Sequence, residues 1–172
     1  MSRTWHEARV LAIDPTSKGF GFVVFAQSMH LLDWGVATLE HNREARTLVR
    51  INGLLGRYDP EVVILEKTGV RGCRRGERVM GLLTAITSLA RSQHRNVRCV
   101  SRAQVRQAFS KRGARTKHEI AASIVELFPE LFPRLPPYRK LWMSEDSRMA
   151  IFDAASFALA YFDAEMKTIS SH

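Results

Sequence analysis

The sequence contains few cysteines and no long hydrophobic stretch. Its 172 residues include two cysteines, Cys73 and Cys99, which are too few for a disulfide framework and are not spaced as a CxxC metal knuckle. This usage is typical of a reducing compartment. No apolar run approaches the roughly 20 residues that a membrane-spanning helix needs, and the first residues contain no apolar signal stretch. We therefore expect a soluble, cytoplasmic protein that does not engage a membrane.

The signatures of several enzyme classes are also missing. His118 and Glu119 lack the second histidine of the HExxH zinc-peptidase motif, and the other histidines show no metal-ligand spacing. No serine stands in the GxSxG setting of a hydrolase nucleophile. There is no internal repeat, and the 45% hydrophobic and 25% charged residues are ordinary for a globular domain. The composition thus excludes a fibrous or disordered protein, and we expect no small-molecule substrate.

Acidic residues are scarce in the middle of the chain. Residues 71–118 contain 13 Lys and Arg and one acid, whereas residues 1–70 contain 8 of each and residues 119–172 contain 5 basic and 8 acidic side chains. The formal net charge of the whole chain is +9, so the middle segment holds more than the entire surplus. Clustered Lys and Arg release phosphate counterions together, which favours a nucleic-acid partner over a merely solvated basic face.

Hydrophobic periodicity predicts a mixed α/β fold. Short apolar runs predict strands over residues 8–13, 20–25, 31–39, 61–66 and 96–100. Helical spacing predicts helices over residues 44–57, around 79–90, and over 101–109, 116–128 and 144–166. Three strands joined by short turns form an antiparallel meander, and the continuously apolar fourth strand is central and parallel. We expect one domain over residues 1–166, a five-stranded mixed sheet flanked by helices, followed by a short polar tail over 167–172.

Two kinds of helix boundary signal are present. Ser101, Thr116 and Ser144 each precede a predicted helix, and Glu119 completes a capping box with Thr116. The proline-rich stretch over residues 129–140 cannot be a helix interior, so we predict a loop or lid there.

Three carboxylates interrupt apolar runs at structural edges. Asp14 follows the first predicted strand, Glu66 ends the fourth, and Asp153 lies within the last helix. Each acid taken alone could be a helix cap or a salt-bridge partner. If the first and fourth strands are parallel neighbours, however, Asp14 and Glu66 share one sheet end, and the last helix can bring Asp153 to them. Like charges held close together need a cation, and carboxylate ligands favour Mg²⁺ or Mn²⁺. Two such ions would support phosphodiester hydrolysis.

Four motifs occur in a fixed order along the chain. They are Ala-Ile-Asp-Pro-Thr-Ser at residues 12–17, the glutamate that ends the fourth strand, Val-Arg-Gln-Ala at 105–108 with Arg-Thr-Lys at 115–117, and Asp-Ala-Ala at 153–155. In this order the sequence resembles the RuvC-type Holliday-junction resolvases of the RNase H-like superfamily, over roughly residues 8–128 and 145–163. The resemblance implies an RNase H-like fold and an Mg²⁺-dependent endodeoxyribonuclease, usually a homodimer, that cleaves four-way DNA junctions.

The resemblance also assigns roles to residues. Asp14, Glu66 and Asp153 match the metal-binding catalytic acids, and Lys117 matches a basic residue that supports cleavage. The family usually has a fourth acid one helical turn before the last one, where this sequence has Ala150. Asp146 lies two turns before Asp153 on about the same face and could substitute as a metal ligand. Its alternative role is that of an acid at the helix N-terminus.

The basic residues of the middle segment are the candidate DNA contacts. They are Arg71, Arg74, Arg75, Arg78, Arg106, Lys111, Arg112, Arg115 and Lys117. The family tends to carry an aromatic residue just after the strand-four glutamate, whereas this sequence has Thr-Gly-Val at 68–70. Later in the chain, Tyr138, Arg139, Lys140 and Trp142 could stack on and clamp nucleic acid. A loop packed down by its own aromatic residues is the alternative for that stretch.

Three other functions are compatible with the same residues. One is a protein that binds junctions or structured nucleic acid but has little or no catalytic turnover, which the Ala150 departure motivates. Another is an RNA-processing nuclease of the same superfamily. The third is a phosphotransferase, because residues 14–19 also resemble the phosphate hairpin of the actin and sugar-kinase fold. That fold needs a second lobe, for which 172 residues leave little room.

Overall fold

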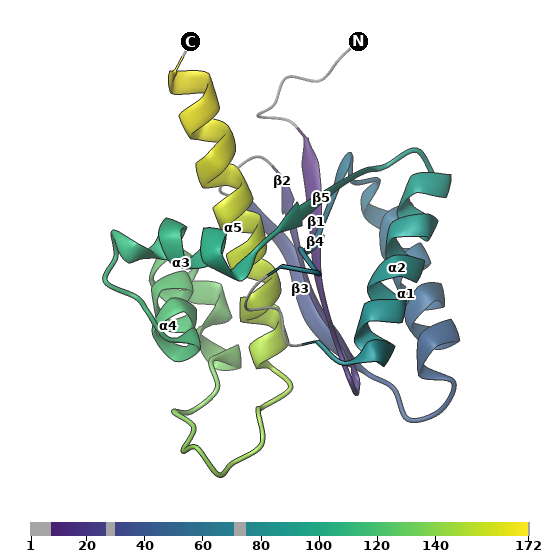
Figure 1. Ribbon diagram of the computed structural model, residues 1–172, viewed down its shortest axis with the longest axis horizontal. Coiled ribbons are helices and arrows are strands. Elements are labelled where there is room, and N and C mark those ends of the chain that lie inside the picture. Colours follow the sequence, from purple (N-terminus) through teal and green to yellow (C-terminus); the bar gives the residue numbers. More distant parts are fainter. Residues whose placement is uncertain (1–7, 27–29, 71–74, 172) are drawn as a thin grey trace.

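Five strands form one mixed sheet in the order β3-β2-β1-β4-β5 (Figure 1). The strands are β1 Arg9–Thr16, β2 Gly19–Ala26, β3 His30–Thr38, β4 Val62–Glu66 and β5 Asn96–Val100. The antiparallel meander and the parallel pairing of β1 with β4 and of β4 with β5 confirm the predicted sheet. The computed structural model describes residues 8–26, 30–70 and 75–171. Arg71 and Arg74, two candidate DNA contacts, lie outside the described residues.

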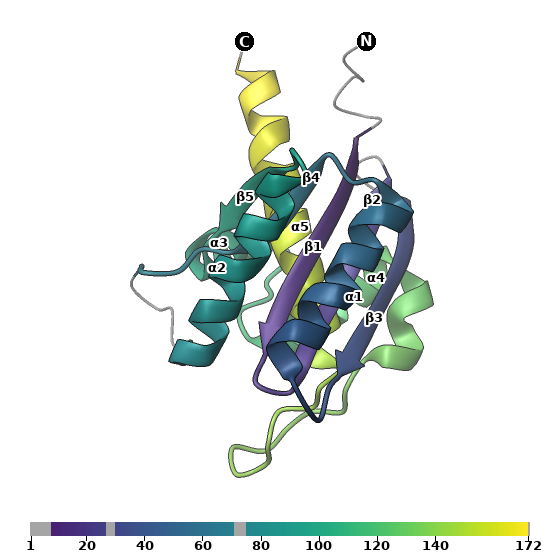
Figure 2. The same cartoon turned by 90° about the vertical axis from the view of Figure 1, so that its right-hand side faces the viewer.

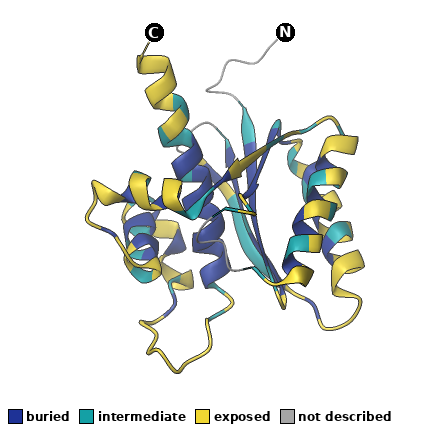
Figure 3. Cartoon of the chain, viewed as in Figure 1, coloured by how far each residue is buried: buried dark blue, intermediate teal, exposed yellow. Residues whose placement is uncertain are grey.

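Helices cover both faces of the sheet (Figures 1 and 2). They are α1 Arg43–Tyr58, α2 Glu77–Ser92, α3 Arg102–Ser110, α4 Lys117–Leu127, α5 Met149–Ser170 and the 3₁₀ helix η1 Pro129–Arg134. On one face α1 and α2 lie side by side, and on the other α5 packs on the sheet with α3 and α4 outside it. The first half of α5, residues 149–158, is the most deeply buried helical segment (Figure 3). None of the helices in the described ranges is both long and apolar enough to cross a bilayer.

The alternation of side chains along each strand decides which acids meet. Leu11 and Ile13 belong to the core under α1 and α2, whereas Val10 and Ala12 belong to the core under α5. Successive side chains of a strand point to opposite faces, so Asp14 lies on the same face as Val10 and Ala12 and points toward α5. In β4 the even-numbered residues likewise belong to the α5 core, so Glu66 faces the same way.

The strand register aligns these two acids. Ala12 pairs with Ile64 in the parallel β1–β4 ladder, so Asp14 and Glu66 each lie two residues beyond one paired position. Both side chains therefore project from the same end of the sheet toward α5. The central position that the sequence predicted for β4 is confirmed, since β4 lies between β1 and β5 and all five of its residues are buried.

The boundaries of β1 and α5 differ from the sequence prediction. β1 continues to Thr16, three residues beyond the predicted strand, and a two-residue turn separates it from β2 because Thr16 pairs with Gly19. The prediction that Ser144 caps the last helix is wrong, because α5 begins at Met149. Asp146 forms the turn before it: its carboxylate accepts the Arg148 backbone N–H at 2.9 Å. α5 also continues past residue 166 to Ser170, so most of the expected tail is helical.

The capping signals before α3 and α4 are confirmed. Ser101 and Gln104 form a reciprocal capping box, and so do Thr116 and Glu119. In the proline-rich stretch, residues 129–134 form η1 instead of a loop. The Leu131 and Leu135 N–H groups donate to the carbonyls three residues earlier, and neither of these two short turns needs an N–H from Pro133. The chain after η1 has no regular structure until α5 begins.

Candidate active site

The three predicted acids lie together at one end of the sheet, beneath α5. Their side chains are almost fully buried, with 1% of Asp14, 4% of Glu66 and 6% of Asp153 exposed. Asp14 comes from β1, Glu66 from the last position of β4, and Asp153 from the second turn of α5. Unpaired carboxylates buried to this extent would cost several kcal/mol each, so the cations around them decide the electrostatics of the site.

Arg75 joins the two acids that come from the sheet. Its guanidinium forms an ion pair with Asp14 through Nη2, and its Nε donates to Glu66 Oε2 at 2.5 Å. The remaining terminal nitrogen donates to the backbone carbonyl of Pro15 at 3.1 Å. Arg75, which the sequence offered as a phosphate contact, thus occupies the gap between two candidate metal ligands.

Arg102 joins the sheet acids to the helix acid. Its Nε donates to Glu66 Oε1 at 3.0 Å, and its Nη1 donates to Asp153 Oδ1 at 2.7 Å. The guanidinium also lies over the ring of Phe157, with Cζ 4.8 Å from the ring centroid. These contacts fix the Arg102 side chain between β4 and α5.

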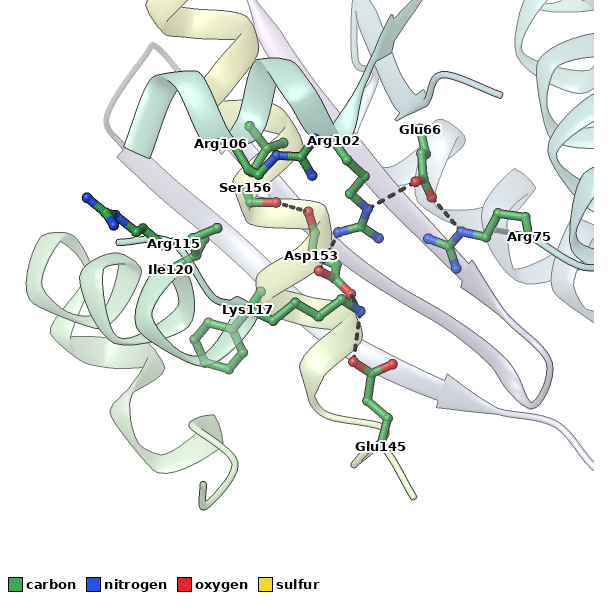
Figure 4. A pocket seen from close by; sticks show the side chains of 12 residues that line it. Glu66, Arg75, Arg102, Arg106, Arg115, Lys117, Ile120, Glu145, Asp153 and Ser156 are labelled. Carbon is green, nitrogen blue, oxygen red and sulfur yellow. Dashed lines mark hydrogen bonds and ion pairs between the residues drawn. The ribbon is translucent and has the colours of Figure 1, made fainter. Parts of the chain in front are cut away.

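Lys117 completes the cluster from the start of α4. Its Nζ lies 2.9 Å from Asp153 Oδ2 and 2.8 Å from Glu145 Oε1 (Figure 4). Acids and bases therefore alternate through the cluster in the order Asp14, Arg75, Glu66, Arg102, Asp153, Lys117 and Glu145. Each buried carboxylate contacts a cation, which offsets the cost of burying it.

The two aspartates respond differently to this environment. Burial raises the pKa of Asp14 to about 7, and the negative charge of Asp153 acts in the same direction, while Arg75 partly opposes both. Burial also disfavours the charged form of Asp153, but Arg102 and Lys117 outweigh it and hold the pKa of Asp153 below its usual value. Asp153 is therefore the firmly ionised member of the pair, and Asp14 is the one that takes up a proton near neutral pH.

A pocket of about 390 Å³ opens over these residues. Its lining includes the buried acids Glu66 and Asp153. The basic residues of the lining are Arg75, Arg102, Arg106, Arg115 and Lys117. Figure 4 shows these side chains around Asp153, with Arg106 coming from α3, Arg115 from the turn before α4, and Lys117 from the first position of α4. The pocket therefore combines buried carboxylates with a rim of positive charge.

The three buried acids offer carboxylate oxygens, which are the ligands that a hard divalent cation such as Mg²⁺ prefers. Their present spacing does not suit one, because guanidinium groups separate them. Among the described residues, no three Asp, Glu, His or Cys side chains lie close enough together to hold an ion. Binding of Mg²⁺ or Mn²⁺ by Asp14 and Glu66 would therefore require Arg75 to withdraw.

Other candidate residues lie away from the pocket. Asp146 forms an ion pair with Arg148 at 2.7 Å and contributes to a neighbouring cavity instead of the lining around Asp153. Hydrogen bonds from Arg148 hold the pKa of Asp146 below its usual value. Arg78 is an exposed residue in the first turn of α2. Lys111 and Arg112 follow α3 and are also exposed, and none of the three lines the pocket around Asp153.

Sequence reasoning missed Arg102 and Glu145. Arg102 could have been found, because it stands two residues after the end of β5, the parallel neighbour of β4, and so had to lie at the same sheet end as Glu66. Glu145 gave no comparable signal, since it lies in an irregular segment before α5 whose path the sequence does not determine.

Neither a protein-family profile nor a curated protein sequence matches this chain. Solved structures do match. Thermus thermophilus RuvC has a TM-score of 0.67 at 24% sequence identity, covering 93% of this chain and 97% of that one. The same protein in complex with a Holliday junction substrate gives a TM-score of 0.67 at 23% identity, covering 92% and 96%.

Fowlpox virus resolvase, solved with substrate Holliday junction DNA, matches with a TM-score of 0.55 at 18% identity, covering 90% of this chain and 99% of that one. The yeast mitochondrial Holliday junction resolvase Ydc2 matches with a TM-score of 0.56 at 17% identity, covering 97% and 83%. At such low identities the likeness establishes the fold. The chain has the RNase H-like fold of the RuvC-type resolvases, as its motifs predicted.

Proposed function

We propose that this protein is a metal-dependent endonuclease that cleaves branched DNA, with four-way Holliday junctions as its substrate. The observation that carries the proposal is the convergence of Asp14, Glu66 and Asp153 from β1, β4 and α5 at one sheet end. Glu66 and Asp153 line a pocket with a basic rim, and Arg75 of that rim pairs with Asp14. The shared fold adds support, because the matched proteins are described as RuvC, a Holliday junction resolvase and a viral resolvase.

The acids would hold Mg²⁺ or Mn²⁺, as two ions in one site. When bound, such ions activate a water molecule and stabilise the leaving oxygen in phosphodiester hydrolysis. Asp153 suits this role because it stays ionised across the physiological range. Asp14 and Glu66 become available only when the ion pairs with Arg75 open. The role proposed for Arg75 is to stabilise the acids until DNA and metal arrive.

The basic rim would bind and orient the substrate. Arg106 and Arg115 line the pocket without an ion pair to the buried acids, so their guanidinium groups are suited to bidentate contacts with phosphate oxygens. Lys117 would neutralise charge at the scissile phosphate, since its Nζ already lies within 2.9 Å of Asp153. Binding through this rim should weaken steeply as salt concentration rises.

A cleavage assay tests the proposal. The full chain is incubated with Mg²⁺ and an end-labelled four-way DNA junction, and with a duplex of one arm sequence. We expect paired nicks near the branch of the junction and none in the duplex. Asp14→Asn should reduce the rate by at least about 100-fold. Asp163→Asn, which changes a half-buried acid of α5 outside the pocket, should leave the rate unchanged. Absence of nicking by the wild-type chain would reject the proposal.

A binding protein without turnover is the second candidate. It is favoured by the arginines that pair with the acids and by the absence of an acid at Ala150. This candidate predicts tight, salt-sensitive junction binding with no cleavage in Mg²⁺ or Mn²⁺. Nicking that disappears in Asp14→Asn would exclude it. An RNA junction of matched sequence, cleaved faster than the DNA junction, would instead indicate an RNA-processing enzyme.

We also propose a homodimer, which the resemblance to RuvC-type resolvases implies. Two pockets related by a two-fold axis would nick two symmetric strands of a junction. Light scattering coupled to size-exclusion chromatography, with and without junction DNA, measures the stoichiometry. A monomer on the junction would contradict this part of the proposal.

A further inference from the structure

The exposed aromatic side chains gather in one region of the molecule. Tyr138 is 75% exposed and Trp142 is 79% exposed, and among the described residues the one other exposed aromatic side chain is Phe132. The remaining described aromatic residues are buried or half-buried. Leu141, between the two rings in sequence, is 97% exposed. The expectation that this loop packs down on its own aromatics therefore does not hold, and the rings face solvent.

This loop, residues 135–148, joins η1 to α5 and projects from the body of the protein (Figures 1 and 2). Its base is attached to α4. The His118 Nε2 atom lies 3.2 Å from the Pro136 carbonyl oxygen, and the His118 ring meets the Tyr138 ring edge-on at 5.5 Å. At the tip, Arg139 donates to the Met143 carbonyl at 2.8 Å. The loop therefore presents its rings from a fixed base.

Positive charge accompanies the rings. Residues 131–143 contain three basic residues and no acid, and Lys140 Nζ lies 5.2 Å from the centre of the Trp142 ring. An apolar face edged by cations matches a nucleic acid, whose bases stack and whose phosphates are negative. It matches a second copy of this chain less well, because the two acids of the loop, Glu145 and Asp146, already pair with Lys117 and Arg148.

The loop is also continuous with the acid cluster. A second cavity of about 390 Å³ is lined by Tyr138 and Arg139, and it shares Lys117 and Glu145 with the pocket around Asp153. A DNA strand that follows the surface from one cavity to the other would therefore pass from Tyr138 to the buried acids.

We infer that Tyr138 and Trp142 form a stacking platform for unpaired DNA bases at the branch point of the substrate. The inference rests on the proposed function and locates the part of the site that distinguishes a branch from a duplex.

Binding of the full chain without metal tests the inference. The probes are an immobile four-way DNA junction and a duplex of one arm, titrated in EDTA. Trp142→Ala and Tyr138→Ala should each weaken junction binding by about ten-fold or more and change duplex binding by less than about two-fold. Trp142→Phe, which keeps a stacking ring, should retain most of the affinity. Phe132→Ala, an exposed aromatic residue on η1, is the matched control and should change neither complex.

Several results would overturn the inference. They are equal losses on junction and duplex, no loss in either alanine variant, the same loss in Phe132→Ala, or a wild-type chain that does not prefer the junction. Self-association that depends on Trp142, measured by light scattering without DNA, would assign the rings to a second copy instead. If Trp142-dependent junction binding is found but no junction is cleaved, the nuclease proposal fails and the platform stands.

Discussion

Gly21 of β2 lies directly against Ala150 of α5: a β carbon built on Gly21 would come within 2.3 Å of the Ala150 carbonyl carbon. Gly21 is also the register partner of Asp14 in the β1–β2 ladder. The missing side chain therefore lets α5 approach the sheet beside the first acid of the site. One turn further along the helix, this approach places Asp153 at the same sheet end as Asp14 and Glu66.

Gly21→Ala should separate α5 from the sheet. The added methyl group meets helix backbone, which cannot move aside as a flexible side chain could, so we expect a loss of at least about 1–3 kcal/mol in the free energy of unfolding. Gly53→Ala is the control, because Gly53 is an exposed position of α1 where an added β carbon would meet no neighbour within 4 Å beyond its own helix turn. It should stabilise by up to about 1 kcal/mol. Urea unfolding measures the free energy of unfolding of both variants. Equal changes in the two would contradict the close contact between Gly21 and Ala150.

The strand faces could be predicted because apolar residues alternate with a period of two, and the burial of Leu11 and Ile13 on one side places Asp14 on the other. The end of β1 could not. Pro15 and Thr16 are residues that favour turns, yet both pair with β2 residues here, since the short hairpin extends the ladder beyond the apolar run. Pairing across the hairpin therefore overrode the local preference of Pro15 and Thr16 for a turn.

The cations of the site were less predictable than its acids. Charge clustering indicated that Arg75 belongs to a basic segment, but nothing in that pattern says whether an arginine points at solvent, phosphate or protein. Its contact with Asp14 spans 61 positions of sequence, and it depends on how the chain returns after β4. For Asp146, the two-turn spacing from Asp153 assumed a helix that in fact begins later.

Asp14→Asn should stabilise the protein at alkaline pH. The pKa of Asp14 lies at about 7 in the folded state against 3.8 for the free side chain, so the folded state binds the proton more tightly. The stability from this carboxyl is fully present below about pH 4 and is lost as pH rises through 7. Asparagine removes this dependence. In EDTA we expect the variant to exceed wild type by a few kcal/mol at pH 8, with the difference shrinking toward pH 4.

Thermal or urea unfolding at pH 4.5, 6 and 8 measures this difference. Asp163→Asn in the last third of α5 serves as the reference, because Asp163 is half-buried and pairs with Lys167 one turn later in the same helix. A difference between Asp14→Asn and wild type that is constant across this pH range would contradict the raised pKa of Asp14.

Arg75→Gln should increase the affinity for Mn²⁺. An ion entering between Asp14 and Glu66 must displace the charge-assisted hydrogen bonds of Arg75, and a neutral glutamine competes less. Since such bonds contribute on the order of 1.5–3 kcal/mol each, we expect affinity to rise by about ten-fold or more. Titration calorimetry on the metal-free chain measures it without any substrate. Arg78→Gln, an exposed arginine three positions later, should leave the affinity unchanged. Weaker binding in Arg75→Gln would show that Arg75 helps to form the site.

Thr116→Ala should reduce cleavage by more than its effect on stability explains. The Thr116 hydroxyl accepts the Glu119 backbone N–H at 3.2 Å, and Glu119 Oε2 accepts the Thr116 N–H at 2.9 Å. Losing this cap should cost about 1 kcal/mol. Because Lys117 is the first residue of α4, fraying there also releases its amino group from Asp153. We expect junction cleavage to fall by about ten-fold at temperatures where the variant remains folded.

Two matched variants separate the cap from the loss of a hydroxyl group in general. Thr116→Ser keeps the capping oxygen and should restore both stability and cleavage. Thr84→Ala removes an exposed hydroxyl that donates to the Met80 carbonyl one turn earlier in α2, and it should leave cleavage unchanged. Junction binding, measured in EDTA, should change little in all three, because Lys117 acts at the scissile phosphate and the other basic residues of the rim remain in place. If Thr116→Ala unfolds more easily yet cleaves at the wild-type rate, the position of Lys117 does not depend on this cap.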